Sequence, residues 1–259
     1  MISQILETMR YREMIKNMVI RDLKVKYQRS LLGFLWTLLN PLLLFVIYII
    51  VFSQVVRLEI PHYWAFLLSG LFAWNFFAQS IVTASNAIRY NANLTTRIYF
   101  PQEVLIVSSV LSKLVEFGLE LFILLGIFLI FYPKIYLLNL FFLPVVVLIQ
   151  TILIIGLVFP LSCLMVFFKD MEHILSLLMT GWFFLTPIFY PDFLIPTVYL
   201  KYFELNPMFD LISLYRSLLY QGELPDVIQL FRSCSVSILF FLVGYNIFNR
   251  YKALFAEVA

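Results

Sequence analysis

Long apolar runs alternate with short polar breaks along most of the chain. A membrane-spanning helix needs about 20 predominantly apolar residues. On that criterion we predict six spans, at about 32–56, 64–88, 104–132, 138–167, 173–190 and 228–248. Backbone polar groups have to be satisfied within the segment inside a bilayer, so each span should be helical. The pattern therefore predicts an all-α integral membrane protein.

Two stretches depart from the pattern of a simple span. Residues 1–30 mix charged positions with apolar ones at near-helical spacing, which predicts an amphipathic helix on the cytoplasmic membrane surface. A short flank without such a helix is the alternative. Residues 191–226 contain four prolines and only short apolar pieces, so we predict short re-entrant helices on the outer side there. Residues 31–259 would then form a single six-span domain.

Polar residues inside two of the spans add detail. Asn40 and Pro41 interrupt the first span, which predicts a kink or local unwinding near its middle. In the second half of the second span, Asn75, Gln79 and Thr83 belong to a polar row that would gain nothing from contact with lipid. We therefore expect part of that span to face protein or water.

The basic residues orient the chain. Seven of the 18 fall in the first 30 positions, and an N-terminus inside the cell also puts further basic residues in the cytoplasm, namely Arg89, Arg97, Lys169, Arg250 and Lys252. Fewer would face outside, namely Arg57, Lys134, Lys201 and Arg216. The positive-inside rule thus predicts both termini in the cytoplasm. A seventh span at 208–220 would move Arg250 and Lys252 outside, which counts against it.

Composition excludes a soluble fold. The chain is 63% hydrophobic and 13% charged, whereas soluble domains have about 25% charged residues. The opening residues are charged throughout and are not a signal peptide. The N-terminal basic cluster could bind nucleic acid, but directly before a span a membrane flank is the better interpretation. Cys163 and Cys234 lie in separate apolar stretches and predict neither a disulfide nor a metal site.

Catalytic and nucleotide-binding motifs are missing from the sequence. The eight glycines never form the GxxxxGK[ST] loop that cradles phosphates, and no HExxH motif occurs. His62 and His173 lie far apart in the predicted topology, so a histidine metal site is not expected. We predict no enzyme activity and no cofactor in this chain. If it transports a substrate with ATP, another chain has to bind the ATP.

Several segments together carry a family resemblance. They are RDLKVKYQRSLLGFLWTLLNPLL (21–43), LLSGLFAWNFF (67–77), NLTTRIYFPQEVL (93–105), FFKDMEHIL (167–175), FLTPIFY (184–190) and LNPMFDLISLYRSLLYQG (205–222). In their order and spacing the chain resembles the permease subunits of type-2 ABC exporters. Within these it resembles the polysaccharide-export branch of O-antigen (Wzm-like), teichoic-acid and capsule permeases.

The resemblance implies a partnership and a cargo. It implies a homodimer in the cytoplasmic (inner) membrane with two cytoplasmic ABC ATPase subunits, which would bind ATP and Mg. It also implies export of a polyprenyl-diphosphate-linked polysaccharide through a channel at the dimer interface. One alternative is the same architecture exporting a small lipid, lipo-oligosaccharide or drug. The other is an integral membrane enzyme of glycan synthesis, for which Asp192, Glu204 and Asp210 are the external acidic cluster to test.

The loop at 89–103 is the candidate contact with the ATPase. It mixes charges with aromatic anchors, as a docking segment requires. Its candidate residues are Arg89, Tyr90, Asn93, Arg97, Tyr99, Phe100, Pro101 and Glu103. The Lys169–His173 turn, with Lys169 and Asp170 as its candidate residues, is a weaker second contact. An ordinary positive-inside loop is the alternative.

Charged residues near and within the membrane supply two further candidates. Lys24, Lys26 and Arg29 could bind the lipid diphosphate, because basic side chains pair with phosphates. General attraction to anionic lipid explains them equally well. Lys113, Glu116 and Glu120 lie three and four residues apart, hence on one helix face. We interpret them as a structural ion pair rather than a proton relay, because Lys113 can pair with Glu116.

Aromatic residues, 18% of the chain, suggest how a glycan could pass. Sugar rings present C–H faces that pack on aromatic planes, so a conduit lined with aromatics could hold successive sugars weakly. The conduit candidates are Trp36, Phe45, Tyr48, Phe52, Phe72, Trp74, Phe76, Phe77, Trp182, Phe183, Phe189 and Tyr190. The outer-gate candidates are Tyr199, Tyr202, Tyr215, Arg216 and Tyr220. The alternative is packing against lipid and at the membrane interfaces.

Overall fold

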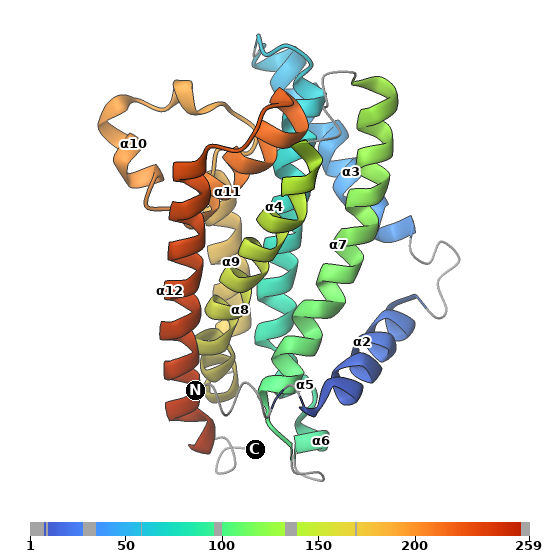
Figure 1. Ribbon diagram of the computed structural model, residues 1–259, viewed down its shortest axis with the longest axis vertical. Coiled ribbons are helices and arrows are strands. Elements are labelled where there is room, and N and C mark those ends of the chain that lie inside the picture. The colour runs from blue at the N-terminus through green and yellow to red at the C-terminus, as the bar shows by residue number, and fades with distance from the viewer. Residues whose placement is uncertain are drawn as a thin grey trace.

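The described part of the chain is a bundle of helices without a strand (Figure 1). A computed structural model describes residues 8, 10–27, 35–57, 59–95, 100–132, 139–168 and 170–254. Within these ranges four helical segments are long and apolar enough to cross a membrane, namely Tyr63–Ser85, Glu103–Phe131, Asn139–Phe167 and Val227–Leu254. They contain the α-helices α4 (Tyr63–Ser85), α7 (Glu103–Phe131), α8 (Leu143–Phe167) and α12 (Val227–Tyr251). The predicted all-α membrane character is thereby confirmed for the described residues.

The predicted first and fifth spans correspond to shorter helices. α3 (Leu35–Ile49) continues into a π-helix at Ile50–Val55, and α9 covers Met171–Phe184. α3 runs through positions 40 and 41 without interruption, so the local unwinding predicted there is absent. Pro41 lacks a backbone N–H, so it removes one hydrogen bond, to the carbonyl four residues earlier, and the rest of the helix can continue. The irregularity lies instead in the π-helix, where the backbone widens.

Helix α2 (Arg12–Tyr27) packs against α7 and runs in the same direction. The Ser108 hydroxyl lies 3.5 Å from the sulfur of Met18, and eight residues further along both helices Lys26 bonds to Glu116. The helix expected in this region is therefore present. In Figure 1 α2 slants along the outside of α7, from the end of the bundle that carries α5 toward its outer side.

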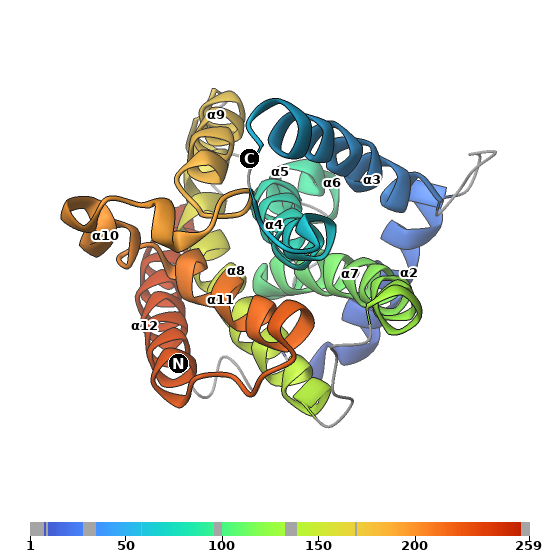
Figure 2. The same cartoon turned by 90° about the horizontal axis from the view of Figure 1, so that it is seen from above.

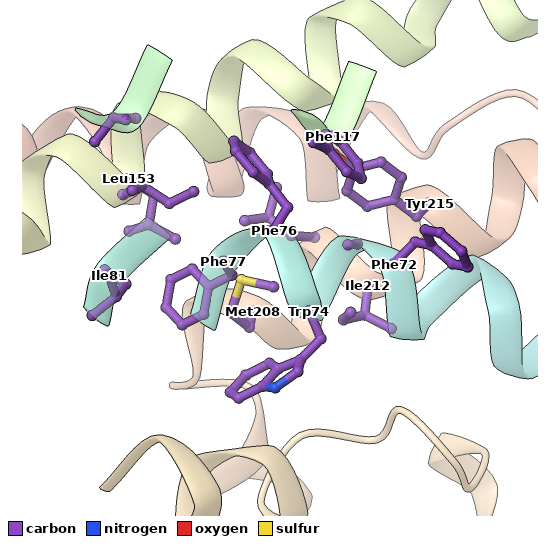
Figure 3. Packing of buried hydrophobic residues seen from close by; sticks show 14 of the residues in the cluster. Phe72, Trp74, Phe76, Phe77, Ile81, Phe117, Leu153, Met208, Ile212 and Tyr215 are labelled. Carbon is purple, nitrogen blue, oxygen red and sulfur yellow. The ribbon is translucent and has the colours of Figure 1, made fainter. Parts of the chain in front are cut away.

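Helix α4 forms the centre of the bundle. Figure 2 shows it surrounded by α3, α7, α8, α9 and α11 (Pro207–Arg216). Phe72, Phe76, Phe77 and Ile81 all have 3% or less of their surface exposed. In Figure 3 they lie among the buried side chains of the neighbouring helices, namely Phe117, Leu153, Met208, Ile212 and Tyr215. The core thus joins helices from the whole length of the chain.

A polar link crosses this core. Gln150 on α8 donates to the carbonyl of Ala73 at 2.8 Å, and the Tyr215 hydroxyl donates to Gln150 Oε1 at 2.7 Å. Both side chains are 1% exposed or less. A buried polar group is costly unless it is hydrogen-bonded, so this link fixes how α4, α8 and α11 face one another.

Helices α8 and α12 approach very closely at two glycines. A Cβ atom placed on Gly244 would lie 1.9 Å from the carbonyl oxygen of Gly156, and one on Gly156 would lie 2.5 Å from the backbone nitrogen of Phe241. Small residues that let backbones approach are typical of helix pairs in membranes. Beside the crossing, the ring of Phe159 packs on those of Tyr245 and Phe248.

The region predicted to be re-entrant forms short helices. It contains a 3-10 turn (Asp192–Leu194), α10 (Thr197–Phe203), α11 and a π-helix (Ser217–Gln221). α11 is buried in the bundle, whereas α10 has no buried residue and projects from it (Figure 2). Asn206 links α11 to α9, because its side-chain oxygen caps α11 at Met208 and accepts a hydrogen bond from Trp182 of α9. α10 and α11 lie at the end of the bundle opposite α5 (Ala87–Tyr90) and α6 (Ala92–Thr95) (Figure 1).

Candidate functional site

Helix α5 is joined to the start of α9 at one end of the bundle. The Tyr90 hydroxyl donates to Glu172 Oε1 at 2.7 Å, and Arg89 Nη1 lies 3.6 Å from Glu172 Oε2. The hydrogen bond to Glu172, with a smaller contribution from desolvation, raises the pKa of Tyr90. Tyr90 nevertheless keeps 64% of its surface exposed. It can therefore contact a partner while it is tied to α9.

A second contact joins the start of α7 to the end of α12. Lys252 Nζ donates to Glu103 Oε1 at 2.7 Å, and Glu103 is only 3% exposed. Phe100 is also buried, whereas Pro101 is half-buried and Asp170 is exposed just before α9. Of the docking candidates, the side chain of Asn93 and residues Arg97, Tyr99 and Lys169 lie outside the described residues. Glu172 lies within the predicted Lys169–His173 turn but was not singled out, and Lys252 was not predicted, because their partners are distant in sequence.

A polar cavity of about 470 Å³ lies between α2, α4 and α7. Its charged centre is Glu116, whose Oε2 accepts from Lys26 Nζ at 2.7 Å and from Lys113 Nζ at 3.0 Å. Arg21, Thr83, Ser109 and Ser112 are among the other lining residues. Lys24 is exposed on α2, and Arg29 lies outside the described residues. The lysine predicted to meet a lipid diphosphate, Lys26, is thus engaged with a carboxylate of the same chain.

The polar lining continues one turn deeper. Glu120 is 5% exposed and shares a small pocket with Asn75 and Gln79 of α4 and with Lys113 and Glu116. Within the described part of the chain, its carboxylate has no hydrogen bond or ion pair. Asn75 and Gln79 of the polar row of α4 therefore share a pocket with the charged row of α7, and Thr83 lines the larger polar cavity, although Gln79 and Thr83 are themselves exposed.

Aromatic rings from α3, α4 and α9 form one contiguous group, here called the aromatic cluster. It consists of Tyr48, Phe52, Trp74, Phe77, Trp182, Phe183 and Phe189. Phe52 stacks on Phe189 with ring centroids 4.7 Å apart, and Tyr48 stacks on Phe183 at 5.7 Å. The structure thus brings together aromatic residues from three predicted spans.

The conduit candidates differ in exposure. Trp74, Phe77, Phe183 and Phe189 are buried within the cluster, and Phe45, Tyr48, Phe52, Trp182 and Tyr190 are partly exposed. Phe72 and Phe76 are buried on other sides of α4, where Phe76 stacks on Phe117 of α7 at 4.6 Å. The side chain of Trp36 lies outside the described residues. Phe184, which is 56% exposed beside Phe183, was not among the predicted residues.

The outer-gate candidates fall into two groups. Tyr199 and Tyr202 are exposed on α10, whereas Tyr215 and Arg216 are buried at the end of α11. Arg216 Nη2 donates to the carbonyl of Ile188 at 2.7 Å, and its guanidinium carbon lies 3.7 Å from the centre of the Phe66 ring. Tyr220 donates to the carbonyl of Pro61 at 2.7 Å and accepts at its own carbonyl from Tyr132. These bonds tie the end of α11 to α4 and α7.

The acidic residues of the same end do not form a metal site. Asp210 is buried and held by the guanidinium of Arg232 from α12. Asp192 and Glu204 are exposed on the segments flanking α10. Among the described residues, no group of three or more His, Cys, Asp or Glu side chains could hold a metal ion.

Comparison with known proteins gives the family. The profile of the ABC-2 type transporter family matches residues 13–220, a range that includes α2, the aromatic cluster, the polar cavity and α11. The chain belongs to this family. It is a multi-pass membrane protein of the ABC-2 type, in agreement with the apolar helices of the described region.

Individual relatives match over nearly the whole chain. The O-antigen export system permease protein RfbA of Myxococcus xanthus is 36% identical over 261 residues, covering 99% of both chains. The protein of the same name from Klebsiella pneumoniae is 34% identical over 245 residues, covering 92% of both. The polysialic acid transport protein KpsM of Escherichia coli is 22% identical over 246 residues, covering 91% of this chain and 92% of its own.

Proposed function

We propose that this chain is the membrane subunit of an ATP-driven exporter of a polyprenyl-diphosphate-linked, O-antigen-like polysaccharide. The observation that carries the proposal is the 36% identity, over 99% of both chains, to an O-antigen export permease. The ABC-2 family implies an ABC ATPase as partner. In the proposed complex a homodimer of this chain binds two ATPase subunits, which hold ATP and Mg. The chain itself supplies the path and no catalytic residue.

The proposed topology has six spans with both termini in the cytoplasm. α3 with its π-helix and α9 would be the first and fifth spans, beside the four longer helices. α5, α6 and the end of α12 lie at one end of the bundle and α10 at the other (Figure 1). The excess of basic residues at the first of these ends supports a cytoplasmic position for it.

The ATPase would dock on α5, α6 and the residues that follow them. Tyr90 and Arg89 reach Glu172 of α9, and Glu103 reaches Lys252 of α12. A movement of the docking segment is thus passed directly to two other helices. The exposed Tyr90 ring can anchor the contact, as aromatic side chains do at the centres of interfaces.

The glycan would pass along the exposed edge of the aromatic cluster. Tyr48, Phe52 and Trp182 are partly exposed there, and Phe184 adds an exposed ring. Two such edges facing each other across the homodimer would make an aromatic-lined conduit. Stacking on ring faces tolerates many sequences, as in proteins that bind single-stranded nucleic acids. Such a wall would hold sugars without reading each one.

The lipid diphosphate would meet the basic residues of α2 and of the segment that follows it. Lys24 is exposed there, and Lys26 lies at the rim of the polar cavity beside Arg21. An enzyme of glycan synthesis is the weaker reading. Its acidic candidate Asp210 is already engaged by Arg232. A small-lipid exporter differs from the proposal in its cargo and is separated from it by the experiment below.

Deletion of the gene tests the proposed function. The lipid-linked glycan should accumulate on the cytoplasmic side while surface glycan is lost, and a plasmid copy of the wild-type gene should restore it. The amount of lipid-linked glycan in lipid extracts of the cytoplasmic membrane and the amount of surface glycan on immunoblots of whole cells provide the readout. A deletion strain with normal surface glycan would contradict the proposal. Loss of a small lipid alone, with the long glycan unaffected, would favour the small-cargo reading.

A further inference from the structure

A second cavity, here called the outer pocket, opens at the end of the bundle that carries α10 and α11. It measures about 240 Å³. Its walls come from the loop before α4, the first turn of α4, the segment after α9, and α11 with its π-helix. The side chains used below are Glu59, Phe66, Asp192, Phe209, Ser213 and Arg216. No residue of α5, of α6 or of the aromatic cluster lines it.

Arg216 is the unusual member of this wall. Its side chain is 6% exposed, yet within the described chain it forms no ion pair with a carboxylate. A guanidinium carries five N–H donors. Among the described residues, the guanidinium of Arg216 makes one hydrogen bond, to the carbonyl of Ile188. Its Nε is buried without an acceptor. Burying a cation is costly unless it is paired and hydrogen-bonded, so Arg216 retains unused donor capacity at the pocket wall.

The other lining groups complement this cation in a particular way. Phe66 and Phe209 both line the wall, but a face of the Phe66 ring is already covered by the Arg216 guanidinium, so the Phe209 ring is the aromatic surface left for a ligand. Asp192 and Glu59 are exposed carboxylates at the pocket and offer only acceptors. A ligand that fits has to accept from Arg216, donate to carboxylates and pack an apolar face on a ring. A sugar ring does all three, whereas a phosphate would be repelled by both carboxylates.

The position of the outer pocket connects it to the aromatic cluster. Phe189 stacks on Phe52 within the cluster, and Pro191 and Asp192, which line the pocket, follow it closely in sequence. Tyr63 at the start of α4 donates to the carbonyl of Phe189 at 2.8 Å and holds this segment in place. A glycan that moves along the exposed edge of the cluster would reach the pocket at its outer end.

We propose that the outer pocket binds one sugar ring of the exported glycan as it leaves the conduit. The proposal rests on the proposed function, because it takes the cargo to be a glycan. Arg216 donates to ring hydroxyls, Asp192 and Glu59 accept from others, and Phe209 packs on the C–H face. Binding of successive rings at this point opposes backward slippage between rounds of ATP hydrolysis.

Thiol protection tests occupancy directly. Cys163 and Cys234 are replaced by Ala, and Ser213→Cys places one thiol in the pocket wall. The control, Val198→Cys, lies on α10 at a residue that is 69% exposed and outside the pocket lining. The complex with its ATPase is reconstituted with ATP and the lipid-linked glycan that accumulates in the deletion strain, then treated with N-ethylmaleimide. Glycan should slow labelling of Ser213→Cys several-fold and leave Val198→Cys unchanged.

Failure of the outer-pocket proposal and failure of the proposed function give different results in this experiment. Equal labelling of Ser213→Cys with and without glycan, in vesicles that export it, would overturn the outer-pocket proposal alone. Protection by inorganic diphosphate without glycan would overturn the sugar assignment. A wild-type complex that moves no glycan would overturn the proposed function and this inference with it.

Filling the pocket provides a second measurement. Ser213→Trp occupies the cavity, whereas Ser213→Ala leaves it open and serves as the matched control. We expect Ser213→Trp to lower the rate of glycan export several-fold while elution volume and basal ATP hydrolysis stay those of the wild type. Ser213→Ala should export normally. Normal export by a folded Ser213→Trp protein would also overturn the proposal.

Discussion

Lys252, at the end of α12, donates a 2.7 Å hydrogen bond to Glu103, whose carboxylate is buried at the start of α7. The two residues are 149 positions apart in sequence. The second oxygen of Glu103 is buried without a partner. The lysine is therefore the main compensation for this buried charge. The pair joins the start of α7 to the end of α12.

Lys252→Met should destabilise the protein by roughly 1–3 kcal/mol, because it leaves the Glu103 carboxylate buried and uncompensated. Adding Glu103→Gln to this variant should restore part of the loss. Thermal unfolding of the purified protein in detergent measures both effects. Lys201→Met, on exposed α10, is the control and should change nothing. Equal unfolding temperatures for Lys252→Met and Lys201→Met would show that the pair contributes no stability.

Glu172→Gln should weaken the coupling of ATP hydrolysis to transport with little effect on stability. Exposed ion pairs contribute about 0–1 kcal/mol, but this residue holds both Arg89 and Tyr90 against α9. The number of glycans exported per ATP hydrolysed in reconstituted vesicles is the measurement. Glu13→Gln, which changes an exposed glutamate of α2, serves as the control. An unchanged number of glycans exported per ATP for Glu172→Gln would show that the contact between α5 and α9 does not couple ATP hydrolysis to transport.

Gly244→Ala should destabilise the fold by roughly 1–3 kcal/mol or more, as overpacking does. The added methyl would lie 1.9 Å from the Gly156 carbonyl oxygen, so α8 and α12 would have to separate. Gly181→Ala is the control, since a Cβ there meets no atom within 4 Å. That variant should be as stable as the wild type or more so by up to about 1 kcal/mol, because alanine favours helix. Yield and thermal unfolding provide the comparison.

Glu116→Gln and Glu120→Gln should have different effects on stability. Glu116 accepts from both Lys26 and Lys113, so Glu116→Gln removes the negative charge that compensates these two neighbouring ammonium groups and puts an amide N–H₂ donor in place of one acceptor oxygen. We expect a loss of roughly 1–3 kcal/mol. Glu120 has no such bond in the described chain, and Glu120→Gln should leave the unfolding temperature unchanged or raise it. A larger loss for Glu120→Gln than for Glu116→Gln would contradict the assigned pairing.

Tyr48→Leu and Phe76→Leu should separate transport from stability. Tyr48 is partly exposed at the edge of the aromatic cluster, and its loss should slow export of long glycans while lowering the free energy of unfolding less than Phe76→Leu does, because less of its surface is buried. Phe76 is buried and stacked on Phe117. Its replacement should cost about 1–2 kcal/mol, through lost burial and lost ring stacking. Normal export by Tyr48→Leu would count against a conduit at this edge.

The sequence predicts features that depend on local pattern better than those that depend on distant contacts. Apolar length predicted helices close to α4, α7, α8 and α12, and a spacing of three residues was enough to suggest the contact of Lys113 with Glu116. Asn40 and Pro41 suggested a kink or local unwinding; the helix continues through both positions without unwinding, and its backbone widens further on, at the π-helix.

Distant contacts explain what was missed in the candidate site. Nothing near Glu103 or Tyr90 in sequence points to Lys252 or Glu172. Phe72 and Phe76 are buried in the core, whereas Tyr48, another conduit candidate, is partly exposed. The pattern of apolar and polar residues in the sequence could not distinguish these two cases. Exposure depends on which helix faces which neighbour, and periodicity within one span does not determine that.

The glycine crossing of α8 and α12 limits how the molecule can change shape. Where two backbones touch without side chains between them, neither helix can slide or roll without a collision between Gly156 and Gly244. These two helices therefore move as one rigid strut. α3 meets α9 through the stacked rings of Tyr48 and Phe183, and α9 meets α4 through tilted and edge-on aromatic contacts, without a backbone-to-backbone contact like that of the glycines. We therefore expect that, if the proposed passage widens, it does so by displacement of α3 and α9 and not by separation of α8 from α12.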